Sequence, residues 1–345
     1  MAGLPRGRKI RRIVCWTLAG LLVVGGGIGF LAYRQLSGNL SSVDINAALG
    51  MDRPADTDNG SQDILVIGSD SRSGDNKGLA GGDTGGTARS DTAMVVHLPA
   101  GGGRATAVSI PRDTLVTRPG CATADGRKLP EARRVMFNSV YTAGGPACVV
   151  KTVENMTGIR MDHFVEIDFA GFKGLVDALG GVTVTTDKPI DDKGSGLRLA
   201  AGTHRLDGTQ SLAFVRTRHG IGDGSDLGRI GLQQQFMLAA LSEIKQQGTL
   251  SNPNKLYEVA DAATKSLTTD SGLASLTDLA SFARSLDGLD PRSMETVTLP
   301  VAYDKSDPNR VVAAQPQADE LWSALKTDEP VPASARKSPV RGGGS

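Results

Sequence analysis

Runs of apolar residues alternate with polar segments along this chain, and their spacing predicts strands interleaved with helices. Short apolar runs bounded by turn residues are typical of buried strands, whereas apolar residues three and four apart are typical of helices. We therefore expect strands at residues 63–68, 92–98, 105–110, 163–168, 182–185, 211–218 and 295–299. Helices are expected at residues 169–179 and 229–245, with two more inside residues 256–286.

The order of these elements predicts the fold class. The strands at 92–98 and 105–110 are separated only by the turn at 99–104, so we expect them to form a hairpin. The helix at 229–245 should turn its apolar side chains inward, namely Leu232, Phe236, Leu241 and Ile244. Strands that alternate with helices favour an α/β fold, and we expect an α/β/α sandwich around a central mixed sheet.

The amino terminus has the pattern of a membrane anchor. Residues 13–33 carry no charge, and residues 1–12 before them hold five basic side chains. At about 1.5 Å per residue this apolar segment can cross a hydrocarbon core of roughly 30 Å. A cleaved signal peptide is the alternative, but its apolar core is usually shorter, about 7–15 residues. Since basic segments stay in the cytoplasm, we expect a single-pass type II transmembrane helix with the rest of the chain outside.

Composition then divides the remainder. Residues 34–61 are polar and are expected to form a stalk linker, residues 62–325 one extracytoplasmic domain, and residues 326–345 a disordered tail. Cys121 and Cys148 both fall outside the membrane, where disulfides form, and we expect them to pair. Two unrelated buried thiols are the alternative. Neither cysteine lies in a CxxC motif, so a zinc site is not expected.

The charge balance limits the possible partners. The formal net charge is only +1, so the basic field typical of nucleic-acid binding is absent and any anion site must be built locally. Five arginines occur at or just beyond predicted strand ends, where open α/β sheets form their ligand crevice. They are Arg89, Arg112, Arg216, Arg218 and Arg229.

These arginines predict a multiply charged anion as ligand. A guanidinium group binds phosphate oxygens in a bidentate manner, and grouped arginines would repel one another without such a ligand. Gln233 follows Arg229 by one helical turn and would lie beside it. Asp70 and Asp91 would suit Mg²⁺, which binds carboxylates together with phosphate oxygens. Taken singly, each charge has a simpler explanation as a surface residue, a local ion pair or a helix cap.

The segments that carry these charges resemble successive motifs of the LytR-CpsA-Psr (LCP) family. The resemblance covers about residues 62–300 and includes residues 152–182. Its charged motifs are Asp70-Ser-Arg-Ser-Gly-Asp75, Arg89-Ser-Asp-Thr92, Ser109-Ile-Pro-Arg-Asp-Thr114, Val215-Arg-Thr-Arg-His219 and the stretch from Gly224 to Gln234.

The resemblance implies an enzyme that transfers a glycopolymer from a polyprenyl-pyrophosphate carrier to peptidoglycan, forming a phosphodiester bond. It implies Mg²⁺ (or Mn²⁺) held by Asp70 and Asp91, with Arg89, Asp91 and Arg112 as catalytic residues. It also implies a set of pyrophosphate-binding residues: Arg89, Arg112, Arg216, Arg218, Arg229 and Gln233. The expected partners are the lipid-linked polymer, peptidoglycan and the membrane through residues 13–33, and no nucleic acid.

One position departs from the family pattern. Where the family usually has a second arginine after Arg229, this chain has Leu232, which either removes a cation from the site or faces the core. Two other functions stay open: a prenyl-pyrophosphate pyrophosphatase that uses water as acceptor, and a non-catalytic membrane-tethered regulator or wall-binding protein. The general base is also open, with Asp91 and Asp113 as candidates.

Overall fold

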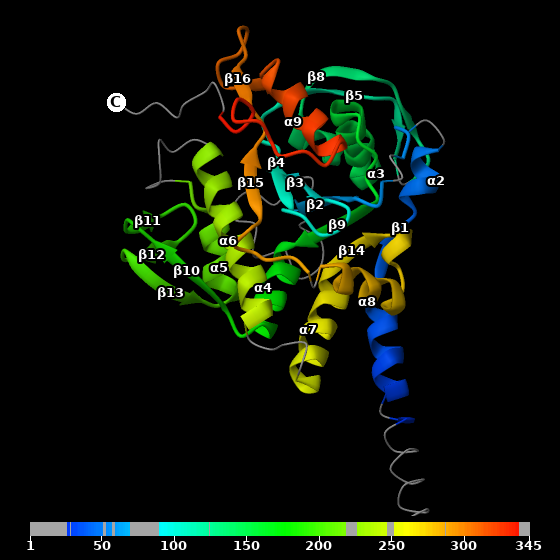
Figure 1. Ribbon diagram of the computed structural model, residues 1–345, viewed down its shortest axis with the longest axis vertical. Coiled ribbons are helices and arrows are strands. Elements are labelled where there is room, and N and C mark those ends of the chain that lie inside the picture. Colours follow the sequence, from blue (N-terminus) through cyan, green and yellow to red (C-terminus); the bar gives the residue numbers. More distant parts are fainter. Residues whose placement is uncertain are drawn as a thin grey trace, which may run out of the picture.

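A mixed sheet of seven strands forms the centre of the protein (Figure 1). The computed structural model describes residues 26–27, 29–50, 53–56, 59–69, 90–123, 125–218, 226–246, 252–286 and 288–337, without the side chains of residues 91, 226 and 227. In spatial order the strands are β1 (Ser41–Val43), β14 (Leu267–Asp270), β9 (His163–Asp168), β2 (Gln62–Ser69), β3 (Ser90–Leu98), β4 (Thr106–Ser109) and β15 (Glu295–Thr298).

The pairing within this sheet confirms most of the predicted strands. β3 and β4 pair antiparallel as the predicted hairpin, with Met94 opposite Ser109. β2 pairs antiparallel with β3 and parallel with β9, and β15 closes one edge parallel to β4. β14 was not predicted, because its four residues lie between two helices and carry no apolar run.

Helices cover both faces of the sheet. Successive side chains of β2 point to opposite faces, so Leu65 packs in one cluster and Ile64 in another. The first cluster includes side chains of α2 (Ile45–Leu49), α3 (Phe137–Thr157) and α9 (Gln317–Lys326). The second includes Phe282 of α8 (Leu276–Ser285). This layering confirms the predicted mixed α/β fold with a central mixed sheet.

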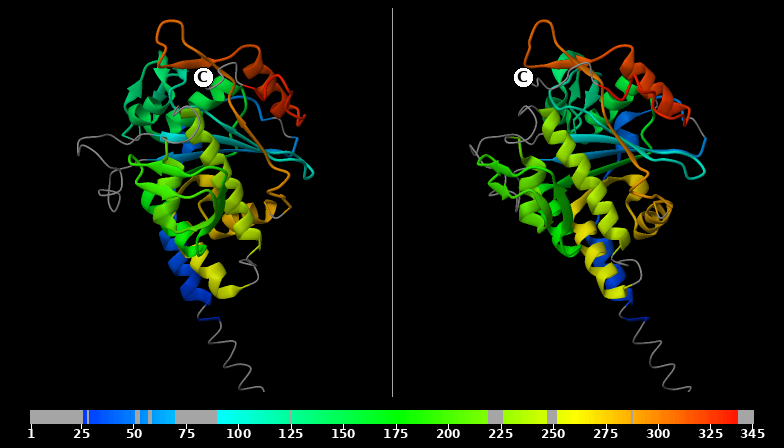
Figure 2. Two further views of the ribbon diagram at one scale, coloured as in Figure 1. Left: turned by 90° about the vertical axis from the view of Figure 1, so that its left-hand side faces the viewer. Right: turned by 60° about the vertical axis from the view of Figure 1, so that its left-hand side comes forward.

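A second group of elements lies beside the sheet and has its own apolar core (Figure 2). Phe214 and Phe236 are buried there. The group consists of α4 (Phe169–Ala178), β10 (Val182–Thr186), β11 (Ile190–Asp192), β12 (Leu197–Leu199), β13 (Gly202–Leu206), α5 (Gly208–Arg216) and α6 (Asp226–Gln246). The remaining elements are β5 (Leu115–Arg118), β6 (Cys121–Ala122), β7 (Lys128–Leu129), β8 (Ala132–Met136), α7 (Pro253–Ser266), η3 (Ser271–Leu273), β16 (Val301–Tyr303) and β17 (Val311–Ala313).

The predicted strand at residues 211–218 is wrong, because this segment belongs largely to helix α5. Asp207 accepts a hydrogen bond from the backbone N–H of Gln210, and the Gln210 side chain accepts one from the backbone of Asp207. This reciprocal capping box starts the helix. The β-branched and aromatic residues are typical of a strand, but this cap and the burial of Leu212 and Phe214 in the helical conformation outweigh that preference.

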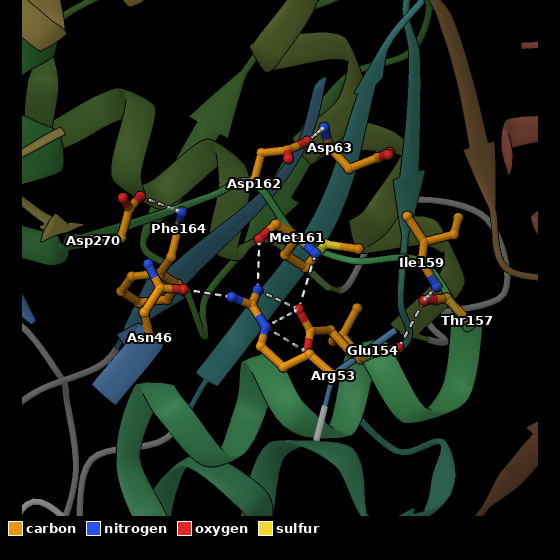
Figure 3. Close-up of polar contacts among 11 residues, drawn as sticks. Asn46, Arg53, Asp63, Glu154, Thr157, Ile159, Met161, Asp162, Phe164 and Asp270 are labelled. Atoms are coloured by element: carbon orange, nitrogen blue, oxygen red, sulfur yellow. Dashed lines mark hydrogen bonds and ion pairs between the residues drawn. The ribbon is translucent and has the colours of Figure 1, made fainter. Parts of the chain in front are cut away.

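The boundaries predicted for the folded domain are too narrow at its amino-terminal side. Residues 29–39 are helical, β1 joins the central sheet and Ile45 is a core residue, so residues 34–61 are not a free linker. Arg53 is buried against Glu154 of α3, with Arg53 Nε 3.0 Å from Glu154 Oε1, and its Nη2 donates to the Met161 carbonyl at 2.8 Å (Figure 3). Residues 34–61 are rich in polar residues, so their sequence does not indicate these contacts with distant parts of the chain.

The predicted disordered tail also begins too early. Val331 and Ala335 are buried in the main core. Arg336 Nε lies 2.7 Å from Glu295 Oε1 of β15. The segment that follows α9 therefore packs on the domain as far as residue 337, and residues 338–345 lie outside the described residues.

The predicted anchor falls mostly outside the described residues, which exclude residues 1–25 and 28. No helix in the described part of the chain is long and apolar enough to cross a membrane. Further along, the Sγ atoms of Cys121 in β6 and Cys148 in α3 lie 2.05 Å apart, the spacing of the predicted disulfide.

Candidate anion-binding site

A cavity of about 310 Å³ opens where the carboxyl end of β2 meets the helices of the second group. Gly68 of β2 and Thr92 of β3 line it on the side of the sheet. Side chains of α5, α6 and the segment after α5 line it on the other side: Arg216, Arg218, Arg229 and Gln233. The structure thus brings together four of the six residues predicted to bind pyrophosphate.

Arg216 and Arg218 reach the cavity from the end of α5 rather than from one face of a strand. Arg216 is the last residue of α5, and its guanidinium carbon lies 4.9 Å from the centre of the Phe169 ring. Phe169 is the first residue of α4 and also lines the cavity. A guanidinium group over an aromatic face is held by the electrostatic field of the ring. This contact fixes Arg216 beside the cavity.

Arg229 and Gln233 reach the cavity from α6. They lie one helical turn apart and therefore share one face of the helix. Arg229 is buried, with 4% of its surface exposed, so its charge lies in a region of reduced dielectric. Gln233 Nε2 donates a hydrogen bond to the Val215 carbonyl oxygen at 3.2 Å, which ties α6 to the end of α5.

Asp192 is a buried residue of the cavity wall that sequence analysis missed. Its Oδ2 accepts a hydrogen bond from the backbone N–H of Arg218 at 2.7 Å, and its Oδ1 accepts one from Gly194 N at 2.8 Å. Ser195 Oγ and Thr217 Oγ1 lie 2.9 Å apart in the same region. These bonds join the β11–β12 turn to the chain after α5. The Asp-Lys-Gly-Ser-Gly run at 192–196 indicates a turn. It does not indicate that Asp192 accepts a hydrogen bond from the backbone of Arg218.

The electrostatics of the cavity favour an anion. Asp192 is the one carboxylate among the described residues that line it, against the guanidinium groups of Arg216, Arg218 and Arg229. Among the described residues that line the cavity, three guanidinium groups therefore stand against one carboxylate. A pyrophosphate group would supply several oxygens to such a set.

The register of β2 and β3 bears on the predicted metal ligands. Gly68 pairs with Thr92 and Ser69 pairs with Ser90, so Asp91 is an extra residue on β3 at this irregularity. Asp70 follows Ser69 in the chain, although Asp70 and the side chain of Asp91 lie outside the described residues. Across the described part of the chain, no group of three His, Cys, Asp or Glu side chains could hold a metal ion.

A partly buried carboxyl group, that of Glu166, lies between the end of β2 and α3. Tyr141 of α3 donates a hydrogen bond to Glu166 Oε1 at 2.5 Å, and Ser69 also hydrogen-bonds Glu166. Burial raises the pKa of Glu166 above its ordinary value, and these hydrogen bonds only partly oppose the rise. The network fixes the last residue of β2 against α3.

Arg112 does not line this cavity. It follows β4, its Nε lies 3.6 Å from Asp113 Oδ2, and its carbonyl oxygen accepts a hydrogen bond from Asn138 N at 3.0 Å. Arg89 lies outside the described residues. The predicted grouping of Arg89 and Arg112 with the other arginines therefore stays a prediction.

Leu232 is a core residue. It is 7% exposed and packs in the second core cluster with Phe214 and Phe236. The neighbouring Gln233 lines the cavity, whereas Leu232 does not. Its side chain therefore supports the packing of α6 against α5.

Comparison with known proteins agrees with these features. The LytR_cpsA_psr family matches residues 32–327. The cell wall biosynthesis protein LcpA of Corynebacterium glutamicum is 34% identical over 86% of this chain, and the match covers 60% of the length of LcpA. A polyisoprenyl-teichoic acid–peptidoglycan teichoic acid transferase, TagU of Bacillus cereus, is 32% identical over 75% of this chain and 79% of its own length.

The fold is also similar to a solved structure, a LytR-Csp2A-Psr enzyme from Actinomyces oris. The two share 27% sequence identity with a TM-score of 0.61, over 84% of this chain and 96% of the other. The family match begins before β1 and ends after α9. It therefore includes every strand of the central sheet and all residues that line the cavity. This chain belongs to the LytR_cpsA_psr family.

Proposed function

We propose that this protein transfers a glycopolymer from a polyprenyl-pyrophosphate carrier to peptidoglycan and forms a phosphodiester bond. The observation that carries the proposal is the convergence of Arg216, Arg218 and Arg229 on one cavity at the end of β2. A relative of similar sequence, TagU, is named for the transfer of teichoic acid from a polyisoprenyl carrier to peptidoglycan. Both point to a donor whose pyrophosphate is the common recognition element.

The proposed reaction is a single phosphoryl transfer. A hydroxyl oxygen of peptidoglycan forms a bond with the phosphorus nearer the sugar, and the bond from that phosphorus to the bridging oxygen breaks. Polyprenyl phosphate leaves with the electron pair, and the hydroxyl proton passes to a base that is still to be identified. Such reactions depend mainly on positioning and on charge stabilisation.

The arginines would act on the pyrophosphate oxygens. Phe169 holds the guanidinium group of Arg216, and Asp192 holds the backbone of Arg218, so both residues are positioned at the cavity before a donor binds. Arg229 is buried, and its interaction with a developing negative charge would be weakly screened. Gln233 would donate to a phosphate or sugar oxygen.

We also propose Asp70 and Asp91 as ligands of Mg²⁺ (or Mn²⁺). The support is the register at the end of β2, where Ser69 pairs with Ser90, because Asp70 and Asp91 each follow one member of this pair in the sequence. Bound there, the ion would supply positive charge to the pyrophosphate oxygens. Arg89, Asp91 and Arg112 remain the proposed catalytic residues.

The location of the domain is part of the same proposal. The apolar segment at residues 13–33 and the preceding basic cluster favour a type II anchor that holds the domain on the outer side of the membrane. Pairing of Cys121 with Cys148 as a disulfide would be in keeping with an oxidising compartment. A lipid-linked donor in the outer leaflet would be within reach of a domain tethered there.

Product analysis tests this function. The full chain in detergent or liposomes is incubated with a labelled polyprenyl-pyrophosphate oligosaccharide, with and without peptidoglycan. The proposal predicts label on peptidoglycan and release of polyprenyl phosphate only when the acceptor is present. Release of sugar phosphate without acceptor would indicate a pyrophosphatase, and binding without release would indicate a regulator or wall-binding protein; either result contradicts the proposal.

A further inference from the structure

Large apolar side chains that are exposed gather at one end of the molecule. Among the described residues, five large apolar side chains are exposed: Phe30 (61%), Leu31 (66%), Tyr33 (53%), Leu256 (41%) and Tyr303 (55%). The first three lie on the helix at residues 29–39, and Leu256 lies on α7. Figures 1 and 2 show these two helices side by side at one end of the domain, with β16 at the opposite end.

Side-chain contacts hold the two helices together at their carboxyl ends. Asn39 Nδ2 donates to Asp261 Oδ1 at 3.0 Å and lies 3.3 Å from Thr264 Oγ1. Gln35 Nε2 donates to the same Asp261 oxygen at 3.3 Å. Each helix then leads into a strand, and the two strands, β1 and β14, pair in parallel. The helices therefore run in the same direction and are fixed to one edge of the sheet.

This arrangement sets the height of Leu256 along the helix axes. Leu31 lies eight residues before Asn39, and Leu256 lies eight residues before Thr264. At 1.5 Å per residue, both lie about 12 Å below the contact that joins the helices. Leu256 is thus level with Leu31, which belongs to the last turn of the predicted membrane span at residues 13–33.

We propose that the amino-terminal turns of α7 insert into the headgroup region of the outer leaflet and form a second membrane contact beside the anchor. Leu256 would place its side chain at the boundary of the acyl chains, while the neighbouring Lys255 and Tyr257 suit the interface between water and lipid. An exposed leucine at this height would otherwise meet water next to the bilayer. The occupant of this surface is the lipid bilayer itself.

A second contact has a consequence for the site. A domain held by one helix can tilt about it, whereas two contacts on adjacent helices define its orientation. The sheet edge that carries β1 and β14 would then hold the arginine cavity at a constant distance from the leaflet that contains the lipid-linked donor. The inference rests on the proposed anchor and does not depend on the transfer reaction.

Fluorescence quenching by lipids tests the inference in the full chain. Single cysteines are introduced by Leu31→Cys, Leu256→Cys and Tyr303→Cys in a Cys15→Ser background, labelled with a fluorophore and reconstituted into phosphatidylglycerol–phosphatidylcholine vesicles. A fraction of the lipid carries a nitroxide quencher near its headgroup. Tyr303 on β16 is the matched control, because its side chain is equally exposed and lies at the far end of the domain.

The expected result is loss of most of the fluorescence at positions 31 and 256 and unchanged fluorescence at position 303. Quenching at 31 without quenching at 256 would overturn the α7 contact and leave the anchor intact. Absence of quenching at both positions would contradict the anchor and the α7 contact together. Because no turnover is measured, these results are separate from a failure of the proposed transferase activity.

Discussion

Asp192 holds its part of the cavity wall through the polypeptide backbone. Its carboxylate accepts hydrogen bonds from the amides of Gly194 and Arg218, which lie far apart in the sequence. A buried carboxylate with backbone donors on both oxygens is held firmly in one orientation. The position of Arg218 therefore depends on a residue that we do not expect to touch the substrate.

The substitution Asp192→Asn is predicted to weaken donor binding. The amide nitrogen of asparagine cannot accept one of the two backbone hydrogen bonds, so the chain at Arg218 would shift. Loss of one such bond, about 1–3 kcal/mol, corresponds to a rise in KM for the lipid donor of about 5- to 150-fold. Asp191→Asn is the control, because the neighbouring Asp191 is exposed and pairs with exposed Arg198. Equal KM values for both variants and the wild type would contradict this role.

Arg53 offers a test of stability away from the cavity. It pairs with Glu154 where both side chains are nearly inaccessible, at 6% and 2% exposure. Arg53→Met would leave the carboxylate of Glu154 buried without its cation, which should lower the free energy of unfolding by about 3–5 kcal/mol. Arg198→Met, which breaks an exposed pair, should lower it by less than about 1 kcal/mol. Urea unfolding of both variants measures the difference, and similar losses would argue against the buried pair.

At the scale of elements, the segment after α9 is fixed to the sheet by a buried histidine. His97 of β3 lies between Asp63 of β2 and Asp328, with Nδ1 and Nε2 each 3.0 Å from a carboxylate oxygen. Burial lowers the pKa of His97, but hydrogen bonds and charges from Asp63 and Asp328 outweigh burial and raise it above the ordinary value of 6.5. The charged imidazole therefore links the two carboxylates in the folded protein.

This link predicts a pH dependence of stability. A pKa raised on folding contributes stability that is complete below the unfolded pKa of about 6.5 and is lost as pH rises through the folded value. His97→Gln should therefore destabilise the protein more at about pH 6 than at about pH 8.5, as measured by urea unfolding. His204→Gln, on the exposed β13, is the matched control and should show no such trend. A destabilisation by His97→Gln that is independent of pH would contradict a charged His97.

The bond between Cys121 and Cys148 is expected to stabilise α3 and the strands that precede it. It closes a loop with a sequence separation of 27, for which chain entropy predicts a contribution of about 3–4 kcal/mol. Alkylation with and without reductant, followed by mass spectrometry, should show both cysteines protected until reduction. Cys121→Ser should lower the urea midpoint, whereas Cys15→Ser, in the predicted anchor, should not. Free thiols in the unreduced protein would rule out the bond.

Individual elements differ in how far the sequence predicts them. The strands of the β3–β4 hairpin follow from their short apolar runs, and the helices α4 and α6 follow from apolar residues at helical spacing. The sequence pattern wrongly predicts a strand where helix α5 lies, because the capping residues determine the conformation of this segment more than its β-branched residues do. The local sequence does not predict β1 and β14, because each forms a strand only by pairing with neighbouring strands of the sheet.

The same limit applies to the candidate site. Arg216, Arg218, Arg229 and Gln233 were identified from residue type and motif, and the structure places them in one cavity. Asp192 and Phe169 were missed because they act by holding other residues, which only the folded arrangement reveals. A sequence can show which residues carry a charge but not which contacts in the fold orient them.

At the scale of the whole molecule, the proposed function depends on a cluster of arginines at the junction of the sheet and the second group of elements. The cavity is lined by three helices, a turn and two strand ends, so no single segment could bind a pyrophosphate in this way. The sequence match across residues 32–327 covers all of these parts. The central claim is that this cavity binds the pyrophosphate of a lipid-linked donor.

Binding of a labelled polyprenyl pyrophosphate to the full chain tests this claim most directly. Arg229→Gln and Arg218→Gln should each weaken binding about 10- to 100-fold, the loss expected for one charge-assisted contact to phosphate. Arg205→Gln, which removes an exposed arginine paired with Glu243 near the carboxyl end of α6, should bind as the wild type does. Wild-type affinity in both cavity variants, with folding unchanged by circular dichroism, would contradict the account.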